Sequence, residues 1–379
     1  VDLNAHSFGG SGQSTNIPTI TMSGSDASTN IATLTNSSTT TNVTVYGAIT
    51  LTKQSASALD DVISQATGAT LTVSGAITDS TGTSAVQLQV GSSGNAGTVT
   101  FGNSSTTYAG GTTVAYGTLK ANANSTPTTG TVTSGPFGTN TIVVTSNGTL
   151  DVAGNVIANA ISLNGGTVLS STATTGRVTG GVTLGASSYF AAGSSAILTV
   201  DTTAINDATN NYAVTSGTSG NTGTVVFSVA NTYTGGTTVA YGTLRAGNTS
   251  AFNTAKVTVN NNSATLDIYG YAIANDIDLA GTGVSSAGAL QNTNTSQGST
   301  PTLTGTITLV NNTYIGGTAN YILDSSSSNI SGAYSLTKVG SNTITLNDAN
   351  TYTGGTTVNA GILKFGADYV VTSSAVTSS

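Results

Sequence analysis

The aspartates are the residues that would carry out chemistry if this chain were an enzyme. Every acidic side chain is Asp, and three pairs lie close in the sequence: Asp60 and Asp61, Asp201 and Asp207, and Asp276 and Asp278. A glycosidase needs two carboxylates about 5–10 Å apart across a cleft. Asp276 and Asp278 alternate with apolar residues, so both are expected to point outward from one face of a strand. We interpret such pairs as solvated surface charges and predict no catalytic residue.

Other groups that serve catalysis or metal binding are scarce. His6 is the one histidine, and it lies in a Gly/Ser-rich stretch without a candidate partner, so no Ser-His-Asp triad is predicted. The absence of Cys excludes disulfides, thiolate zinc sites and a cysteine nucleophile. Calcium would need Asp267 and Asp278 on adjoining turns, and the chain has no Asp-rich nonapeptide array. We therefore predict no metal and no cofactor.

The composition restricts the fold class and the partners. Only 7 Lys and Arg stand among 379 residues, too few to neutralise phosphates, so no nucleic-acid partner is expected. Strong helix formers are rare, whereas hydrophobic residues make up 37% of the chain and lie in short runs. No run approaches the roughly 20 apolar residues of a membrane helix, so no membrane insertion is expected. With a non-Met start that suggests processing, this composition predicts an ordered all-β protein that is extracellular or on a bacterial cell surface.

Internal repeats organise the chain. The segment TYAGGTTVAYGTL starts at residue 107, and close copies start at residues 232 and 351, so the spacings are 125 and 119 residues. Each copy follows a strand-like run, at residues 98–101, 224–227 and 343–346. We predict three supra-repeats, 1–119, 120–244 and 245–363, and a C-terminal partial repeat, 364–379, within a single continuous domain, 1–379. The positions that define the repeat are Tyr108, Gly110, Gly111, Leu119, Tyr233, Gly235, Gly236, Leu244, Tyr352, Gly354, Gly355 and Leu363.

Short strands separated by Gly, Asn and Ser clusters predict the architecture. Three- to five-residue runs of alternating or continuous apolar residues recur without a long helical pattern. This pattern favours a right-handed parallel β-helix, a β-solenoid with rungs of roughly 20 residues. The glycine pairs are expected at corners with positive φ, and the repeated tyrosines are expected to pack within the solenoid or at its corners. Residues 57–67 place Leu59, Val62, Ile63 and Ala66 on one helical face, which predicts a short inserted helix.

The third copy carries a family resemblance. Residues 330–364, above all LTKVG at 336–340 and the run from Asn350 to Leu363, closely resemble the autotransporter-associated β-strand repeat. The copies at residues 231–244 and 106–119 match mainly in their second half. The resemblance implies a passenger-type parallel β-helix that is exported to the cell exterior and serves adhesion or cell-surface structure.

Two functions remain open at this point. The first is a non-enzymatic extracellular rod that assembles end to end, head to tail with itself, into a bacterial surface fibre with a role in adhesion and biofilm. The alternative is the passenger domain of a type V autotransporter adhesin that binds cells or glycans as a monomer. Neither terminus resembles a solenoid cap, so open strand edges are expected there. Candidate subunit contacts are Val1, Leu3, Tyr369, Val370 and Val371.

Overall fold

The computed structural model describes residues 1–8, 19–24, 31–53, 61–80, 85–325, 330–347, 349–366 and 376–378. It divides into two compact units: Val1–Ser188 with Asp201–Thr203, and Tyr189–Val200 with Ala204–Ser379. The predicted all-β parallel β-solenoid is confirmed, and the described residues form about 13 turns. The helical content described is one 3₁₀ turn, Val284–Ser286. Among the described residues, no helix has the length and apolarity to cross a membrane.

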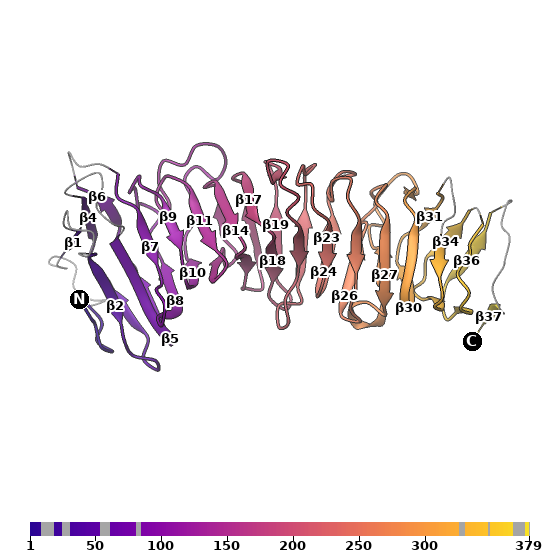
Figure 1. Cartoon of the computed structure of the whole chain (residues 1–379), viewed down its shortest axis with the longest axis horizontal. Coiled ribbons are helices and arrows are strands. Elements are labelled where there is room, and N and C mark those ends of the chain that lie inside the picture. The colour runs from indigo at the N-terminus through magenta and orange to yellow at the C-terminus, as the bar shows by residue number, and fades with distance from the viewer. Residues whose placement is uncertain are drawn as a thin grey trace. The chain divides into compact units, whose positions relative to one another are not determined.

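The first unit is built from short strands (Figure 1). They are β1 (Ile20–Gly24), β2 (Thr33–Asn36), β3 (Val43–Val45), β4 (Ile49–Lys53), β5 (Asp61–Val73), β6 (Ile77–Asp79), β7 (Leu88–Val90), β8 (Ala96–Phe101), β9 (Thr112–Val114), β10 (Gly117–Ala121), β11 (Ile142–Thr145), β12 (Gly148–Asp151), β13 (Val156–Ile157), β14 (Ile161–Asn164), β15 (Thr167–Ser170), β16 (Thr175–Val178) and β17 (Val182–Ala186).

The second unit continues the numbering. Its strands are β18 (Ser188–Ala192, whose first residue belongs to the first unit), β19 (Ile197–Val200), β20 (Ile205–Asn206), β21 (Val214–Ser216), β22 (Thr224–Phe227), β23 (Thr237–Val239), β24 (Gly242–Ala246), β25 (Val257–Val259), β26 (Ala264–Asp267), β27 (Ile277–Gly281), β28 (Leu290–Asn292), β29 (Thr302–Leu303), β30 (Ile307–Gly317), β31 (Tyr321–Leu323), β32 (Ile330–Gly332), β33 (Leu336–Lys338), β34 (Thr343–Leu346), β35 (Thr356–Val358), β36 (Ile362–Phe365) and β37 (Val376–Ser378).

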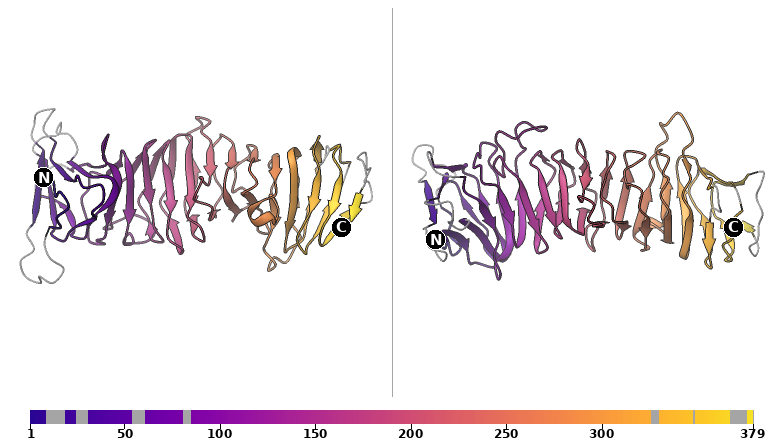
Figure 2. Two further views of the ribbon diagram at one scale, coloured as in Figure 1. Left: turned by 90° about the horizontal axis from the view of Figure 1, so that it is seen from below. Right: turned by 45° about the horizontal axis from the view of Figure 1, so that its top comes forward.

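The strands of each unit stack in parallel columns, one strand per turn (Figure 2). In the first unit β7, β9, β11, β14 and β17 form one column and β8, β10, β12 and β15 another. In the second unit β21, β23, β25, β27 and β30 pair in the same way. Equivalent side chains therefore lie directly above one another from turn to turn.

Turn length varies along the solenoid. Ile142 pairs with Ile161, 19 residues on, whereas Ile277 pairs with Ile307, 30 residues on. Rungs are therefore longer on average than the roughly 20 residues expected from sequence, because many corners carry insertions. Most strands are short and alternate buried with half-buried side chains, as in the pattern of Val43–Val45, whereas β5 has 13 residues and β30 has 11.

The core follows from this alternation. Inward positions hold Val, Ile and Leu, whose branched side chains fit a pleated surface that is covered on one face. Aromatic rings fill the wider places: Phe101 and Phe137 lie 6.3 Å apart between ring centroids, and the equivalent Phe227 and Phe252 lie 6.4 Å apart. The two copies thus repeat their core packing as well as their sequence motif.

The helix predicted near residues 57–67 is wrong for the described part of that segment. Residues 54–60 lie outside the described residues, and residues 61–67 belong to strand β5. The side chains of residues 61–66 are all buried, so no exposed helical face exists. The polar side chain of Gln65 can be buried here because its amide is hydrogen-bonded. The amide oxygen accepts from Asn36 Nδ2 (2.9 Å), and the amide nitrogen donates to the carbonyls of Ser38 and Ala66 (both 2.9 Å).

Gln65→Met tests this strand. The substitution keeps the length of the side chain but removes the bond from Asn36, whose amide keeps only the Thr41 carbonyl, and it takes the amide donor away from the carbonyls of Ser38 and Ala66. It should destabilise the protein by about 1–3 kcal/mol. The control Gln87→Met alters an exposed glutamine and should leave the melting temperature unchanged. Thermal unfolding followed by circular dichroism measures both. Equal melting temperatures for the two variants would contradict the buried position of Gln65.

Candidate functional site: the repeat motif and the buried aspartates

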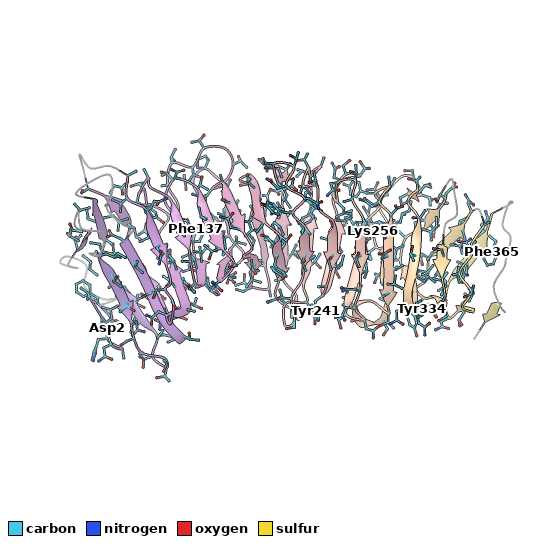
Figure 3. The ribbon with its side chains drawn as sticks, viewed as in Figure 1. Asp2, Phe137, Tyr241, Lys256, Tyr334 and Phe365 are labelled. Atoms are coloured by element: carbon cyan, nitrogen blue, oxygen red, sulfur yellow. The ribbon has the colours of Figure 1, made fainter. Side chains whose placement is uncertain are left out.

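The paired aspartates do not converge on a cleft. Asp276 Oδ1 accepts hydrogen bonds from the Thr306 N–H (2.9 Å) and hydroxyl (2.7 Å), while Asp278 accepts from Lys256 Nζ at 3.0 and 3.1 Å. Lys256 is labelled in Figure 3. Asp61 is buried in β5, and Asp60 lies outside the described residues. The interpretation of Asp276 and Asp278 as purely solvated charges is therefore incomplete, because both make structural contacts.

Asp201 and Asp207 also have separate structural roles. Asp201 Oδ2 accepts from Arg177 Nε (2.9 Å) and Nη2 (2.6 Å). Asp207 is fully buried and accepts from the N–H groups of Thr209, Tyr212 and Thr234 (3.0 Å each). Burial by itself would raise the pKa of Asp207, but these hydrogen bonds outweigh it and hold the pKa below its ordinary value.

A common geometry connects several aspartates. Asp151 and Asp267 occupy equivalent positions, and each accepts the N–H of the residue two positions on. Each also accepts the hydroxyl of a residue on the following turn, Ser171 at 2.5 Å and Thr293 at 2.6 Å. Asp207 receives the Thr234 hydroxyl at 2.7 Å in the same manner. These carboxylates fasten one turn to the next.

Residues suited to metal or triad chemistry are dispersed. His6 is exposed, and its backbone N–H donates to the Leu3 carbonyl at 2.9 Å. Within the described ranges, no three His or Asp side chains gather closely enough to hold a metal ion. Asp267, considered above for calcium, instead pairs with Arg245 Nε at 3.0 Å, and the Arg245 guanidinium lies 4.2 Å from the ring centroid of Tyr269.

The side chains of the repeated tyrosines pack in the core. Tyr108, Tyr233 and Tyr352 are at most 1% exposed. Each hydroxyl forms a hydrogen bond with the threonine four residues on: Tyr108 with Thr112, Tyr233 with Thr237 (2.6 Å) and Tyr352 with Thr356 (2.5 Å). Burial raises the pKa of Tyr108 and Tyr233 well above the ordinary value. These phenols are therefore no platform for sugar rings.

The two residues before each repeated tyrosine form hydrogen bonds with the preceding turn. Asn231 Oδ1 accepts the N–H of Ile205 at 2.8 Å, and the N–H of the next residue, Thr232, donates to the carbonyl of Ile205 at 2.9 Å. The same two hydrogen bonds are made to Ile77 by Thr106 and Thr107, and to Ile330 by Asn350 and Thr351. The motif thus satisfies both backbone groups of one buried isoleucine per copy.

The repeated glycines are required for two different reasons, close backbone approach and positive φ. A Cβ on Gly110, Gly235 or Gly354 would lie 2.1–2.3 Å from backbone atoms of the preceding turn, so each position requires close backbone approach. Positive φ was expected at the glycine pairs, yet among them only Gly111 has it, at +89°. The recurrent positive φ lies instead at the later glycines 117, 242 and 361, with values of +72°, +67° and +69°.

The remaining predicted positions differ in burial. Leu119 and Leu244 are fully buried, whereas the equivalent Leu363 is half-buried. Val1 is 75% exposed and Leu3 is buried. Tyr369, Val370 and Val371 lie outside the described residues.

Lys338 is a core residue whose position the sequence did not reveal. It lies fully buried at the inward position that Val90 and Ser216 take in the other copies. Its ammonium group donates to the carbonyls of Val339 (2.7 Å), Gly340 (3.0 Å) and Ala360 (3.1 Å). Burial lowers the pKa of Lys338 to about 8. The alignment of the three copies was the signal that could have identified it.

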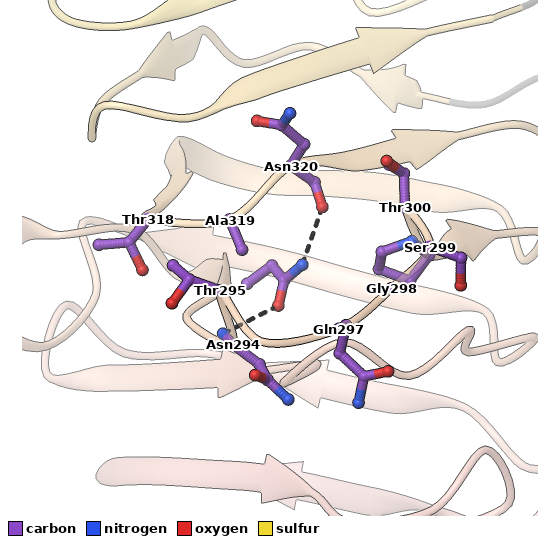
Figure 4. A pocket seen from close by; sticks show the side chains of 11 residues that line it. Asn294, Thr295, Gln297, Gly298, Ser299, Thr300, Thr318, Ala319 and Asn320 are labelled. Carbon is purple, nitrogen blue, oxygen red and sulfur yellow. Dashed lines mark hydrogen bonds between the residues drawn. The ribbon is translucent and has the colours of Figure 1, made fainter.

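A polar recess of about 290 Å³ lies beside residues 292–301 and 318–320 of the second unit. Figure 4 shows Asn294, Gln297, Thr300 and Asn320 around it. Asn292 closes its floor, since its side chain donates to the Asn320 carbonyl (2.8 Å) and accepts the Asn294 N–H (3.3 Å). The lining has no charged residue and no nucleophile set beside a base, so the recess offers no catalytic arrangement.

Gly235→Ala should lower the melting temperature strongly, because the added methyl group would lie 2.3 Å from the Tyr212 carbonyl carbon. Overpacking of this kind costs about 1–3 kcal/mol or more. Gly298→Ala is the matched control, since a Cβ there meets no atom within 4 Å. Differential scanning calorimetry measures the melting temperatures of the two variants. An unchanged melting temperature for Gly235→Ala would refute the close-approach explanation.

The aspartate geometry also predicts an acid limit to stability. The pKa of Asp276 is lowered by its hydrogen bonds from Thr306, and that of Asp207 is lowered as described above, both from an ordinary 3.8. Groups with a depressed folded-state pKa stabilise the protein above the unfolded-state value, and this contribution disappears as the pH falls through the folded-state pKa.

The melting temperature should therefore stay nearly constant from pH 7 to about 5 and fall below about pH 4. Asp207→Asn should lower it at pH 7 and flatten the decline in acid. Calorimetric melting curves across this pH range measure both effects. A fall of tens of degrees between pH 7 and pH 4 would show that other titrating groups dominate.

Comparisons with known proteins agree with this geometry. The passenger-associated-transport-repeat family matches the chain at three places, residues 95–121, 221–246 and 336–365. Each match contains one copy of the Tyr-Gly motif and the strand that precedes it, β8, β22 or β34. Comparison with curated proteins and with solved structures gives no match. The chain is thus a β-solenoid protein that carries three copies of the passenger-associated-transport-repeat, which confirms the predicted resemblance to the autotransporter passenger repeat family.

Proposed function

We propose that this chain is a non-enzymatic extracellular scaffold that assembles end to end into a bacterial surface fibre with a role in adhesion and biofilm. The roles of the aspartates support a scaffold, because Asp151, Asp207 and Asp267 are engaged in holding turns together. The repeat family suggests a secreted or cell-surface location. The partner of the scaffold is a second copy of itself, with cell-surface glycans as further candidate ligands.

The observation that carries the proposal is the incompletely covered strand β36. It pairs with β34 through residues 362–365, yet Ile362 is 59% exposed and Leu363 is only half-buried. The equivalent leucines of the first two copies are fully buried beneath a following turn. Since an edge strand with exposed apolar side chains is a template for strand addition, the exposure of Ile362 and Leu363 makes β36 suited to receive one more strand.

A second edge strand lies in the first unit. Strand β1 pairs with β4, and a cavity of about 390 Å³ lies beside it, lined by polar residues and by Ile20, Met22, Ile31 and Leu34. Val1 and Ile31 are exposed there. The two edges differ, so a contact between β36 of one copy and β1 of the next is heterologous and propagates as a filament.

The monomeric passenger adhesin is the second candidate function. It is favoured by the three family matches, which span both units. In that case, β36 and β1 would be covered by further solenoid turns of the same polypeptide, and the outer face would bind cells or glycans.

Ile362→Lys separates the two candidates. A lysine on an exposed edge strand opposes strand addition, so the variant should remain monomeric while the unaltered protein forms fibres. Val310→Lys is the matched control, because Val310 is 41% exposed on a strand with neighbours on both sides. Sedimentation velocity and negative-stain microscopy give the readout.

Removal of residues 368–379 adds a second test, because it takes away β37, which pairs with β35 at the same end of the second unit, and it should also shorten or abolish the fibres. If the unaltered protein stays a monodisperse monomer at high concentration, end-to-end assembly is wrong and the monomeric passenger is the better description.

A further inference from the structure

The connection between β10 and β11 distinguishes the first unit. It spans residues 122–141, twenty residues, whereas the equivalent connection between β24 and β25 spans residues 247–256, ten residues. The longer connection extends outward beside β9 and β11 (Figure 1). Its tip is closed by an antiparallel bridge between Thr126 and Ser134, with N···O distances of 2.7 and 3.1 Å.

This connection is fastened to later turns. The Ser125 N–H donates to the Val156 carbonyl (2.9 Å), and the Ser125 hydroxyl donates to Asn159 Oδ1 (3.1 Å). Further along, the Thr179 hydroxyl donates to the Thr128 carbonyl at 2.6 Å, across 51 residues of sequence. The connection is therefore held at both sides and forms a fixed wall, which lowers the entropic cost of binding a ligand against it.

Between this wall and the solenoid lies a groove of about 430 Å³, a volume within the range of about 300–1,000 Å³ for ligand sites. Its floor consists of equivalent corners on successive turns: residues 139–141, 158–160 and 179–181, followed by Thr202 and Thr203. These corners stack directly, because Ile142 N–H donates to the Ala160 carbonyl and Ile161 N–H to the Gly181 carbonyl, both at 2.8 Å. The groove thus crosses several turns at the strand spacing of about 4.8 Å.

The lining is uncharged and rich in hydroxyl groups. Thr131, Thr139, Thr141 and Thr203 line the groove, and their hydroxyls have no hydrogen-bond partner among the described residues. Val132, Ala158 and Ala160 contribute apolar groups to the same lining. Hydroxyl and apolar groups together match the hydroxyls and C–H faces of sugar rings, and the net charge of −7 disfavours acidic polymers.

We infer that this groove binds a neutral oligosaccharide chain, with successive sugar hydroxyls meeting the threonines on successive turns. An extended peptide fits less well, since strand addition needs free backbone groups and the floor carbonyls of Ala160 and Gly181 already accept hydrogen bonds from the solenoid. The inference is independent of end-to-end assembly, because the groove lies within the first unit.

The chain itself supplies a variant without the wall. Replacing residues 122–141 by residues 247–256 installs the short connection of the second copy. The exchange keeps a partner for Asn159, because the equivalent Asn275 donates to the carbonyls of Asn253 (3.2 Å) and Ala255 (2.7 Å) in that short connection. The exchanged protein should therefore fold with a similar melting temperature but lack the groove.

Binding of the full chain is measured on an array of immobilised neutral oligosaccharides (glucans, galactans and mannans), acidic oligosaccharides and a Ser/Gly-rich peptide. The full chain should bind at least one neutral series, with affinity rising with chain length, and the exchanged protein should bind at least tenfold more weakly. Thr139→Val with Thr141→Val and Thr203→Val should show the same loss, whereas Thr254→Val, at the position equivalent to Thr139 in the second copy, should bind normally.

Three results would overturn the inference: no neutral oligosaccharide bound by the full chain, a preference for the acidic series or the peptide, or unchanged binding after the exchange. Because fibre formation is read separately by sedimentation, loss of sugar binding in the exchanged protein with fibres intact distinguishes this site from the proposed assembly contact.

Discussion

Hydrogen bonding between successive turns is the interaction on which every other feature of this protein depends. Buried backbone groups must be paired, and in a parallel solenoid the pairs come from the turn before and the turn after. Where a strand ends, side chains take over: Asn231 binds the N–H of Ile205, and Asp207 binds the N–H of Thr234. The abundance of Asn and Thr, the use of Asp as the one acidic residue type, and the scarcity of Lys and Arg agree with this need for short polar side chains at corners.

The repeat motif combines these tasks in one short segment. Asn231 and Thr232 hold the preceding turn, Tyr233 fills the core and binds Thr237, and Gly235 allows the backbone to pass close to Tyr212. The motif therefore joins a corner to the strand that follows it. Its three copies recur with nearly the same contacts, whereas the turns between them vary in length, so the supra-repeat is only loosely periodic.

The sequence allowed the fold class and the repeat positions to be predicted, because both depend on local alternation and on self-similarity. Tyr108 and Gly110 were identified by recurrence alone. The error at residues 57–67 has a physical cause: helical spacing of Val62, Ile63 and Ala66 signals burial on one face, but Ser64 and Gln65 are buried too. Their partners, Thr35 and Asn36, lie 29 residues away, at a distance that no local pattern reveals.

The contacts of the candidate sites could not be predicted from sequence for the same reason, because they join residues that are far apart in the chain. The sequence predicted Asp276 and Asp278 to be solvated surface charges, yet each has a structural partner, Thr306 and Lys256 respectively, which lie on different turns. The groove beside residues 122–141 depends on contacts such as that of Thr128 with Thr179, which join separate turns. Such contacts are decided by how many residues each turn contains, and composition and motif spacing do not determine that number.

The unequal length of the turns has an evolutionary consequence. Because turns of 20 and 30 residues follow one another in the column of β25, β27 and β30, a corner can gain or lose ten residues while the strands on either side still pair. Selection for folding therefore acts mainly on the inward positions of the strands and on the motif, while the corners are free to diverge. In such a fold, a new recognition surface can arise by lengthening one corner, and duplication of a turn supplies the spare corner on which that change is tried.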